Sequence, residues 1–260
     1  MSIQIKNSIK KKFGVKIIVL ISRVLKNKVG FIKKLFLIRA FFIDLKNYKL
    51  LKENHDFSLT TKDLKPMIYE KTDETLVDPI YFFQDAWCAK KIFENKPKHH
   101  VDVGSETGFV GIISQFVPTT MVDIRPVNLS MPGFSFRDGN ITSLPYKDNE
   151  LPSISSICVI EHIGLGRFGD NLDQFGSEKA IKELKRVLAL QGNLYISVPI
   201  DADKSKIYFN AHRSFTREHI LKLFKPLQLI EEKYIYKNVF SDIYDQNKSH
   251  GVGLFHFKKL

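Results

Sequence analysis

The chain has 260 residues, of which 43% are hydrophobic and 26% are charged, and it contains 14 Gly, 10 Pro and 2 Cys. These proportions exclude a disordered or collagen-like chain and favour one main folded domain with an appendage. The two cysteines, Cys88 and Cys158, are too few for a disulfide-stapled secreted fold and lie in apolar stretches. We therefore expect reduced thiols and a cytoplasmic protein.

The positive charge of the chain is concentrated near its N-terminus. Residues 1–54 hold 14 Lys and Arg against Asp44 and Glu53, a net charge of +12. The remaining residues hold 40 − 14 = 26 bases and 28 − 2 = 26 acids, a net charge of zero. A nucleic-acid enzyme more often spreads its bases over a binding face. The sequence thus predicts a basic arm over 1–54 and a neutral domain over 55–260.

The apolar residues of the arm recur mostly three and four positions apart, which predicts an amphipathic helix interrupted near Gly30. They are Ile17, Ile18, Ile21, Val24, Leu25, Phe31, Ile32, Leu35, Phe36 and Ile38. The longest uncharged apolar run, 17–22, is far below the roughly 20 residues of a membrane span. Such a helix suits the surface of an anionic membrane, at the inner face if the protein is cytoplasmic, or packing against the protein itself. Few aromatic residues lie between the bases, which disfavours nucleic acid as a partner.

The rest of the chain predicts an α/β fold. A helix is expected from Asp78 to about Asn95, and short apolar runs then alternate with helix-compatible segments. Strands are expected at 99–103, 119–124, 134–137, 154–160 and 193–199. This alternation predicts a Rossmann-like, doubly wound and mostly parallel sheet. Two further strands, 228–236 and 251–258, follow each other without a helix and should pair antiparallel at the edge of the sheet.

The first predicted strand leads into a glycine-flanked turn, 104–108, before an apolar helix. Gly104 and Gly108 allow the backbone to turn tightly and to approach a ligand. Asp123 follows the second strand, where an acid is placed to accept hydrogen bonds from ribose hydroxyls. Each feature alone is also compatible with an ordinary strand-to-helix turn.

Further polar residues follow the third and fourth predicted strands. Asp138 ends the third strand, and Glu161 and His162 end the fourth. Ligands of open parallel sheets bind at the carboxyl ends of the strands. We therefore expect these side chains to converge with Asp102 and Asp123 on one crevice.

This succession of motifs resembles class I S-adenosylmethionine-dependent methyltransferases. The resemblance rests on Asp-x-Gly-x-x-x-Gly at 102–108, the second-strand acid, Asp138-Gly139, Val-Ile-Glu-His at 159–162 and Arg-Val-Leu before Gly192. More narrowly, the segments 101–105, 123–126, 161–170 and 209–213 resemble a branch of methyltransferases associated with bacterial surface-polysaccharide synthesis. The resemblance covers about residues 78–225.

The resemblance implies S-adenosylmethionine as cofactor and a set of cofactor-binding residues. Gly104 and Gly108 would flank its methionine end, Asp102 would order its ammonium, Asp123 would bind the ribose and Asp138 the adenine amino group. Ser105, Ile124 and Gly139 complete the implied set. Glu106 departs from the small residue that is usual at the middle of the turn, and its carboxylate would repel that of the cofactor unless it points elsewhere.

Methyl transfer to a hydroxyl requires in-line placement and removal of a proton, which favours a histidine or a carboxylate as base. His162 is the first candidate base and His212 the second. Arg167 and Arg213 are candidates for binding an anionic acceptor and Glu161 for contacting the acceptor, although Glu161 and His162 could instead be structural and Arg167 could pair with a nearby Asp. The histidines show no metal-ligand spacing, so no metal site is predicted.

The sequence therefore favours an S-adenosylmethionine-dependent methyltransferase, O-directed, that modifies a sugar or a phosphorylated or nucleotide-linked glycan precursor. The alternative is a non-catalytic protein of the same fold that acts as a binding or scaffold partner in a glycan-assembly complex.

Overall fold

In the computed structural model, residues 30–52 and 55–260 are described, and the chain divides into two compact units between Leu76 and Val77. The domain boundary expected after residue 54 thus lies further along the chain. The polar stretch that follows residue 54 is grouped with the N-terminal unit.

The first unit contains a helix over 30–48, followed by a return segment with one 3-10 turn, η1 (Thr61–Asp63). The apolar pattern expected from Phe31 onward is therefore helical, and Gly30 is the first helical residue that the structure describes. The earlier apolar positions, 17–25, lie outside the described residues. Among the described helices, none is long and apolar enough to cross a membrane.

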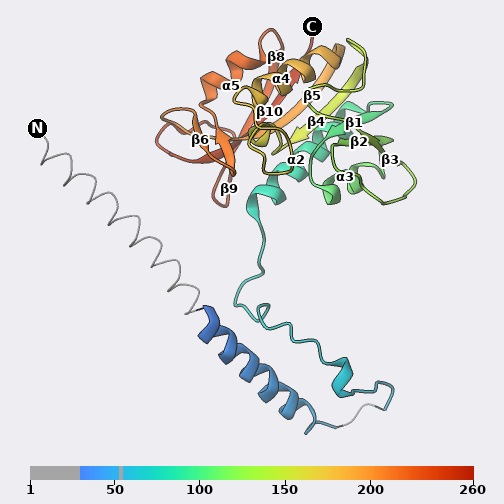
Figure 1. Ribbon diagram of the computed structural model, residues 1–260, viewed down its shortest axis with the longest axis vertical. Coiled ribbons are helices and arrows are strands. Elements are labelled where there is room, and N and C mark those ends of the chain that lie inside the picture. Colours follow the sequence, from blue (N-terminus) through green and yellow to red (C-terminus); the bar gives the residue numbers. More distant parts are fainter. Residues whose placement is uncertain (1–29, 53–54) are drawn as a thin grey trace, which may run out of the picture. The chain divides into compact units, whose positions relative to one another are not determined.

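The second unit is built on an eight-stranded mixed sheet (Figure 1). Its helices are α2 (Pro79–Asn95), α3 (Thr107–Ile113), the 3-10 turn η2 (Ile160–His162), α4 (Gly176–Val187) and α5 (Arg217–Phe224). Its sheet strands are β1 (His100–Val103), β2 (Thr119–Asp123), β3 (Phe134–Asp138), β4 (Leu151–Ile157), β5 (Leu188–Ile200), β8 (Gln228–Tyr236), β9 (Val239–Ser241) and β10 (Gly251–Lys258). A separate hairpin is formed by β6 (Lys206–Tyr208) and β7 (His212–Ser214).

The strand order is β3-β2-β1-β4-β5-β10-β8-β9. The first five of these strands are mutually parallel, and β10 is antiparallel to both β5 and β8. The predicted doubly wound, mostly parallel sheet is confirmed. The antiparallel pairing of the last two long strands is also confirmed, but β10 lies inside the sheet and β9 forms that edge.

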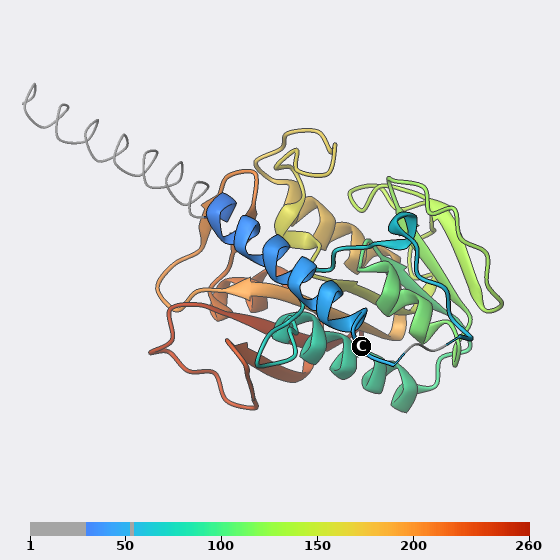
Figure 2. The ribbon, with the colours of Figure 1, turned by 90° about the horizontal axis from the view of Figure 1, so that it is seen from below.

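Helices cover both faces of the sheet, as Figures 1 and 2 show. One apolar core joins α2 and α3 to the sheet and includes Trp87, Ile92, Phe109 and Tyr195. The other joins α4 and α5 to the opposite face and includes Ile181, Leu184, Phe224 and Phe255. Because side chains of a strand alternate between faces, β5 contributes to both cores.

Local sequence explains where the elements next to the crevice begin and end. The side chain of Asp78 caps α2 by accepting from the backbone N–H of Ile80 at 2.9 Å, and Pro79 occupies the first helical position. Strand β4 ends at Ile157, earlier than predicted, because Cys158 has a φ of 53°, a left-handed conformation that no strand continues. The predicted strand residue Ile160 starts the turn η2, so Glu161 and His162 lie on a helical turn.

Candidate active site

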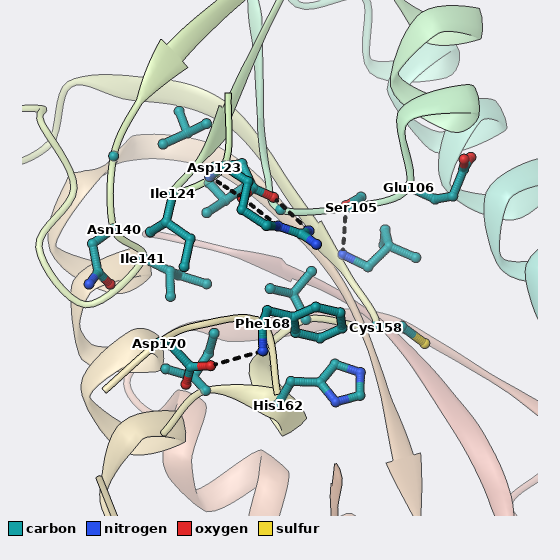
Figure 3. A pocket seen from close by; sticks show the side chains of 18 of the residues that line it. Ser105, Glu106, Asp123, Ile124, Asn140, Ile141, Cys158, His162, Phe168 and Asp170 are labelled. Carbon is teal, nitrogen blue, oxygen red and sulfur yellow. Dashed lines mark hydrogen bonds and ion pairs between the residues drawn. The ribbon is translucent and has the colours of Figure 1, made fainter. Parts of the chain in front are cut away.

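A pocket of about 290 Å³ lies at the carboxyl ends of β1, β2 and β4, close to the lower end of the usual size range of ligand sites (Figure 3). Among the predicted site residues, those that line it are Gly104, Ser105, Asp123, Ile124, Gly139, His162 and Arg167. The ends of the predicted strands therefore meet at one crevice. Fewer of the predicted polar side chains line it than expected, because Asp102, Asp138 and Glu161 do not.

Asp102 lies below the pocket and does not line it. Its side chain is fully buried and accepts hydrogen bonds from the backbone N–H of Ser105 at 3.0 Å, from the Ser105 hydroxyl at 2.6 Å, and from the hydroxyl of Ser155. Burial raises the pKa of Asp102 to about 6 against the lowering effect of these hydrogen bonds. Both carboxylate oxygens hold the turn and the neighbouring strand, and the ordering of the cofactor ammonium by Asp102, through water or directly, stays a prediction.

The turn after β1 leaves its backbone open to the pocket. Gly104 has a φ of +76°, and a Cβ built there would lie 2.9 Å from Cγ1 of Val159. Only glycine fits this conformation and spacing. The Glu106 side chain caps α3 by accepting from the N–H of Phe109 at 3.0 Å, and Figure 3 shows it directed away from the other labelled side chains.

Gly108 leaves room for the Glu106 side chain that caps α3. A Cβ at that position would lie 2.7 Å from Oε2 of Glu106, so the glycine makes room for the capping carboxylate. Gly108 does not line the pocket, and its predicted role beside the methionine end of the cofactor does not fit this position. Glu106 lines the pocket, but its carboxylate is held as the cap of α3 and points away from the other labelled side chains.

Asp123 ends β2 at the pocket and is paired within its own turn. Its Oδ1 accepts from the backbone N–H of Arg125 at 2.8 Å and from Nε of the same residue at 3.3 Å, while Oδ2 lies 3.4 Å from Nη2. The carboxylate is 8% exposed and the Arg125 side chain 57% exposed. The carboxylate is therefore the buried partner of this pair and the guanidinium the exposed one.

At the end of β3, the residues that follow Asp138 line the pocket, whereas the carboxylate of Asp138 does not. Asp138 is exposed and does not line the cavity, whereas Gly139, Asn140 and Ile141 do. The predicted contact of Asp138 with an adenine amino group is therefore not supported by its position. Asn140 is the polar side chain that the structure places there instead.

Glu161 and His162 form a buried neutral pair on η2. His162 lines the pocket, and its Nδ1 lies 2.6 Å from the carbonyl oxygen of Ala211, which requires a proton on Nδ1 and leaves Nε2 unprotonated in the neutral ring. Burial lowers the pKa of His162 to about 4 and raises the pKa of Glu161 to about 8. Although Glu161 Oε1 lies 3.8 Å from His162 Nε2, both groups are neutral at pH 7 and form no ion pair.

Glu161 itself does not line the pocket. Its Oε2 is buried without a hydrogen-bond partner among the residues that the structure describes. Its predicted contact with an acceptor therefore requires some movement of η2, and in this structure it lies behind His162.

A glycine-jointed loop, 163–175, covers the pocket opposite the strand ends. Gly164, Gly166 and Gly169 all have φ between +70° and +89°. The ring of Phe168 lies between the guanidinium groups of Arg125 and Arg167, whose Cζ atoms are 4.8 and 4.9 Å from its centroid. The same ring meets the His162 ring edge to face, with centroids 5.3 Å apart. This part of the loop therefore carries a cation-rich aromatic cluster into the pocket.

Arg213 anchors this loop and does not reach the pocket. It is 6% exposed, and its guanidinium donates to the carbonyl oxygens of Ile163 at 2.5 Å, Asp173 at 3.0 Å and Gln174 at 3.2 Å. The expected acceptor-binding role of Arg213 is thus corrected to a structural one, because its donors are used by the two ends of the loop. His212, the second candidate base, contacts the ring of Tyr208 in the β6–β7 hairpin, with ring centroids 5.0 Å apart, and does not line the pocket.

Several pocket residues were not singled out from the sequence: Tyr81, Arg125, Asn140, Ile141, Cys158 and Phe168. Tyr81 lies in the aromatic start of α2, and that run of aromatic residues was the available signal. Within the same helix, the Oδ1 of Asp85 has no hydrogen-bond partner among the described residues, and burial together with the charges of Glu106 and Asp102 raises the pKa of Asp85 to about 7. The residues next to the turn after β1 therefore produce a negative potential that favours a cationic group.

No group of three metal-ligating side chains occurs among the described residues.

Comparisons with known proteins define the fold. Three solved structures similar to this chain are a protein from Galdieria sulphuraria named for a sarcosine dimethylglycine methyltransferase activity, the cyclase SpnF, and the N-methyltransferase NodS from Bradyrhizobium japonicum in complex with S-adenosylhomocysteine. Their TM-scores are 0.52, 0.51 and 0.50, and their sequence identities 16%, 14% and 14%. The alignments cover 68%, 67% and 73% of this chain and 86%, 81% and 93% of the respective structures.

The chain has the class I methyltransferase fold. A family model described as a Caenorhabditis protein of unknown function, DUF268, matches residues 144–247. This range contains β4, the loop 163–175 and the β6–β7 hairpin, but not the turn after β1. No curated protein matches the sequence. Because a cyclase has a similar fold, the fold alone does not establish an activity, which depends on the residues of the pocket.

Proposed function

We propose that the protein is an S-adenosylmethionine-dependent methyltransferase. The observation that carries this proposal is the pocket at the ends of β1, β2 and β4, where the open backbone at Gly104 faces a half-enclosed cavity beside Asp123. This is the place at which an open α/β sheet binds its ligand.

The residues present fit such a cofactor. Gly104 lines the cavity with backbone that carries no Cβ, and the carboxylate of Glu106, which also lines the cavity, is held by the N–H of Phe109 as the cap of α3. Ile124 and Ile141 give the cavity apolar walls next to Asp123, which suits an adenosine. The unpartnered carboxylate oxygen of Asp85, near the turn, suits the positive charge of a methionine ammonium.

When bound, S-adenosylmethionine supplies a methyl group on a sulfonium that is already a good leaving group, so the protein mainly has to hold the acceptor in line. For a hydroxyl acceptor, a proton must also be removed. His162 is the side chain placed for this, because Nδ1 donates to the carbonyl of Ala211 and Nε2 retains its lone pair.

The acceptor that suits this base is anionic. Burial first, and then the charges of Arg167 and His212, lower the pKa of His162 to about 4, which weakens it as a base. A phosphate bound by Arg167 would neutralise its charge, remove its lowering effect on His162 and so raise the pKa of His162 toward the range of an effective base. We therefore propose a phosphorylated or nucleotide-linked sugar hydroxyl as acceptor, in bacterial surface-polysaccharide synthesis, in keeping with the resemblance seen in the sequence.

Calorimetry with S-adenosylhomocysteine tests cofactor binding directly. We expect Asp123→Ala to weaken binding at least about tenfold, since it removes the hydrogen bonds of a charged group to the ribose. Asp138→Ala is the matched control, because Asp138 ends the neighbouring strand outside the pocket and its removal should leave the affinity unchanged.

Absence of heat at high ligand concentration would contradict the proposal and favour the non-catalytic scaffold. If the cofactor binds, a screen of phosphorylated and nucleotide-linked sugars with methyl-labelled cofactor tests the acceptor. Arg167→Gln should then raise the acceptor KM and leave cofactor affinity unchanged. Turnover only with uncharged acceptors would reject the anionic acceptor while leaving the methyltransferase proposal in place.

A further inference from the structure

The helix over 30–48 is apolar on more than one side. In an α-helix each residue is turned 100° from the one before it, so positions four and eleven apart lie on the same side. Phe31, Leu35 and Phe42 have this spacing, and Ile32, Phe36 and Ile43 repeat it one residue further on. The two sets together form one broad apolar side, which we call the open side.

The opposite side of the helix is partly covered within its own unit, where Phe41 and Leu45 are half-buried and Tyr48 stays exposed. Phe41, Leu45 and Tyr48 line a common pocket with Phe57, Leu59 and Leu64 of the return segment. Asp44 on the same side pairs with Lys71 of this segment at 3.4 Å. The return segment therefore accounts for one apolar side of the helix and for its acidic residue.

No such cover exists for the open side among the described residues of this unit. Its six apolar side chains are between 49% and 64% exposed. Soluble proteins rarely leave so many large apolar side chains exposed together, and such patches mark interaction sites. The open side therefore requires an occupant.

The bases on the open side indicate what the occupant is. Arg39 follows Leu35 by four residues and Lys46 follows Phe42 by four, so both extend from the open side, and Asp44 does not lie there. Around them, residues 1–54 carry a net charge of +12. A second copy of this helix would bring the same positive charge against it, and residues 55–260 have no net negative charge to attract it.

We propose that the open side of the 30–48 helix binds the surface of an anionic lipid bilayer. The apolar side chains enter the boundary between headgroups and acyl chains, and Arg39 and Lys46 extend along their aliphatic stems to the phosphates. The helix then lies in the plane of the membrane surface, and the return segment stays on its water side. This holds whether or not the α/β unit transfers methyl groups.

Flotation of the full-length protein with vesicles tests this proposal. We expect the wild-type protein to float with vesicles of equal parts phosphatidylglycerol and phosphatidylcholine, and only weakly with phosphatidylcholine alone. The triple variant Phe31→Ser, Leu35→Ser, Phe42→Ser should lose more than about a hundredfold in partitioning, given the apolar area withdrawn from the membrane. The matched control Leu172→Ser, Leu190→Ser, Ile243→Ser removes three similarly exposed apolar side chains from the α/β unit and should float normally.

A charge variant keeps the test valid if the triple variant misfolds. Arg39→Gln with Lys46→Gln should lower partitioning about 30-fold, whereas Lys98→Gln with Lys204→Gln removes the same net charge from exposed sites of the α/β unit and should change it little. Equal losses in the two double variants, or normal flotation of both helix variants, would overturn the proposal. So would a wild-type dimer in solution that Phe31→Ser, Leu35→Ser, Phe42→Ser dissociates, since the occupant would then be a second copy.

Discussion

The two sides of the pocket differ in how their polar groups are satisfied. On the strand-end side, formed by Gly104, Ser105 and Asp123, the network around Asp102 pairs both carboxylate oxygens, and the Ser105 hydroxyl accepts from the N–H of Ile157 at 2.9 Å. On the loop side, formed by His162, Arg167 and Phe168, ring contacts dominate, and Glu161 behind them keeps an unpartnered oxygen.

This difference indicates that the pocket combines one side of fixed structure with one side that can rearrange. A fully paired buried network has one low-energy arrangement, so the strand-end side is suited to a ligand that is always the same. Stacked side chains on a glycine-jointed loop can rearrange, as is common for loops that close over a substrate. The expected effects below test whether the two sides are separable in this way.

The largest effect is expected from His162→Gln on the loop side. A general base contributes about 10²–10⁴-fold to the rate, so kcat should fall by that factor while cofactor affinity stays unchanged. His250→Gln is the matched control, since this exposed histidine lies outside the pocket. Turnover at the wild-type rate would remove His162 as the base.

On the strand-end side, Asp102→Ala should destabilise the fold by about 2–4 kcal/mol, because it leaves the hydroxyls of Ser105 and Ser155 and one N–H buried without their acceptor. Urea unfolding followed by circular dichroism measures this loss. Asp138→Ala, at an exposed carboxylate, should stay within about 0.5 kcal/mol of the wild type. A similar small loss for Asp102→Ala would show that the network is not what holds the turn.

The buried pair on η2 makes the stability of the protein depend on pH. The folded state keeps the proton of Glu161 up to about pH 8, whereas the unfolded state releases it near pH 4.5. Since the folded state then binds more protons, the free energy of unfolding should fall as pH rises from 4.5 to 8, by about 1.4 kcal/mol for each unit of pKa difference. Glu161→Gln has no such proton and should lose this dependence.

The comparison is made between pH 6.5 and 8, where His162 titrates only in the unfolded state and does so in both proteins, so that its contribution cancels in the difference. Asp85, whose pKa of about 7 gives the same sign, is present in both proteins and cancels in the difference. The exposed Glu94→Gln serves as control and should follow the wild type. Parallel pH profiles for the wild type and Glu161→Gln would contradict a protonated Glu161.

The smallest effect is expected from Phe168→Ala. The ring is 37% exposed, so stability should change little, whereas loss of its contacts with Arg125 and Arg167 should raise the acceptor KM about fivefold, the size of a cation–π contact of about 1 kcal/mol. Phe175→Ala, at the base of the same loop and 64% exposed, is the matched control. A large loss of cofactor affinity in Phe168→Ala would show that the two sides are not separable.

The sequence predicted the parallel sheet because its strands are apolar runs of useful length separated by helices. It did not predict β6, β7 or β9, since a strand of three residues has no period to detect. The turn after β1 was also predicted, because Gly104 acts locally through its own φ. The roles of Asp102 and Arg213 were not, since Ser155 lies 53 residues from Asp102 and Ile163 lies 50 residues from Arg213. Whether a charged side chain faces a ligand or ties two distant segments together depends on tertiary contacts that spacing does not encode.

The position of β10 between β5 and β8 has a consequence for synthesis of the protein. During translation β5 can pair with β4 and β8 with β9, yet the other edge of β5 and of β8 has no partner until β10 is available. Until then two strand edges are free to pair with other chains. Nascent chains that stop before Gly251 should consequently aggregate, so a chaperone or rapid translation through this segment would be of greatest benefit.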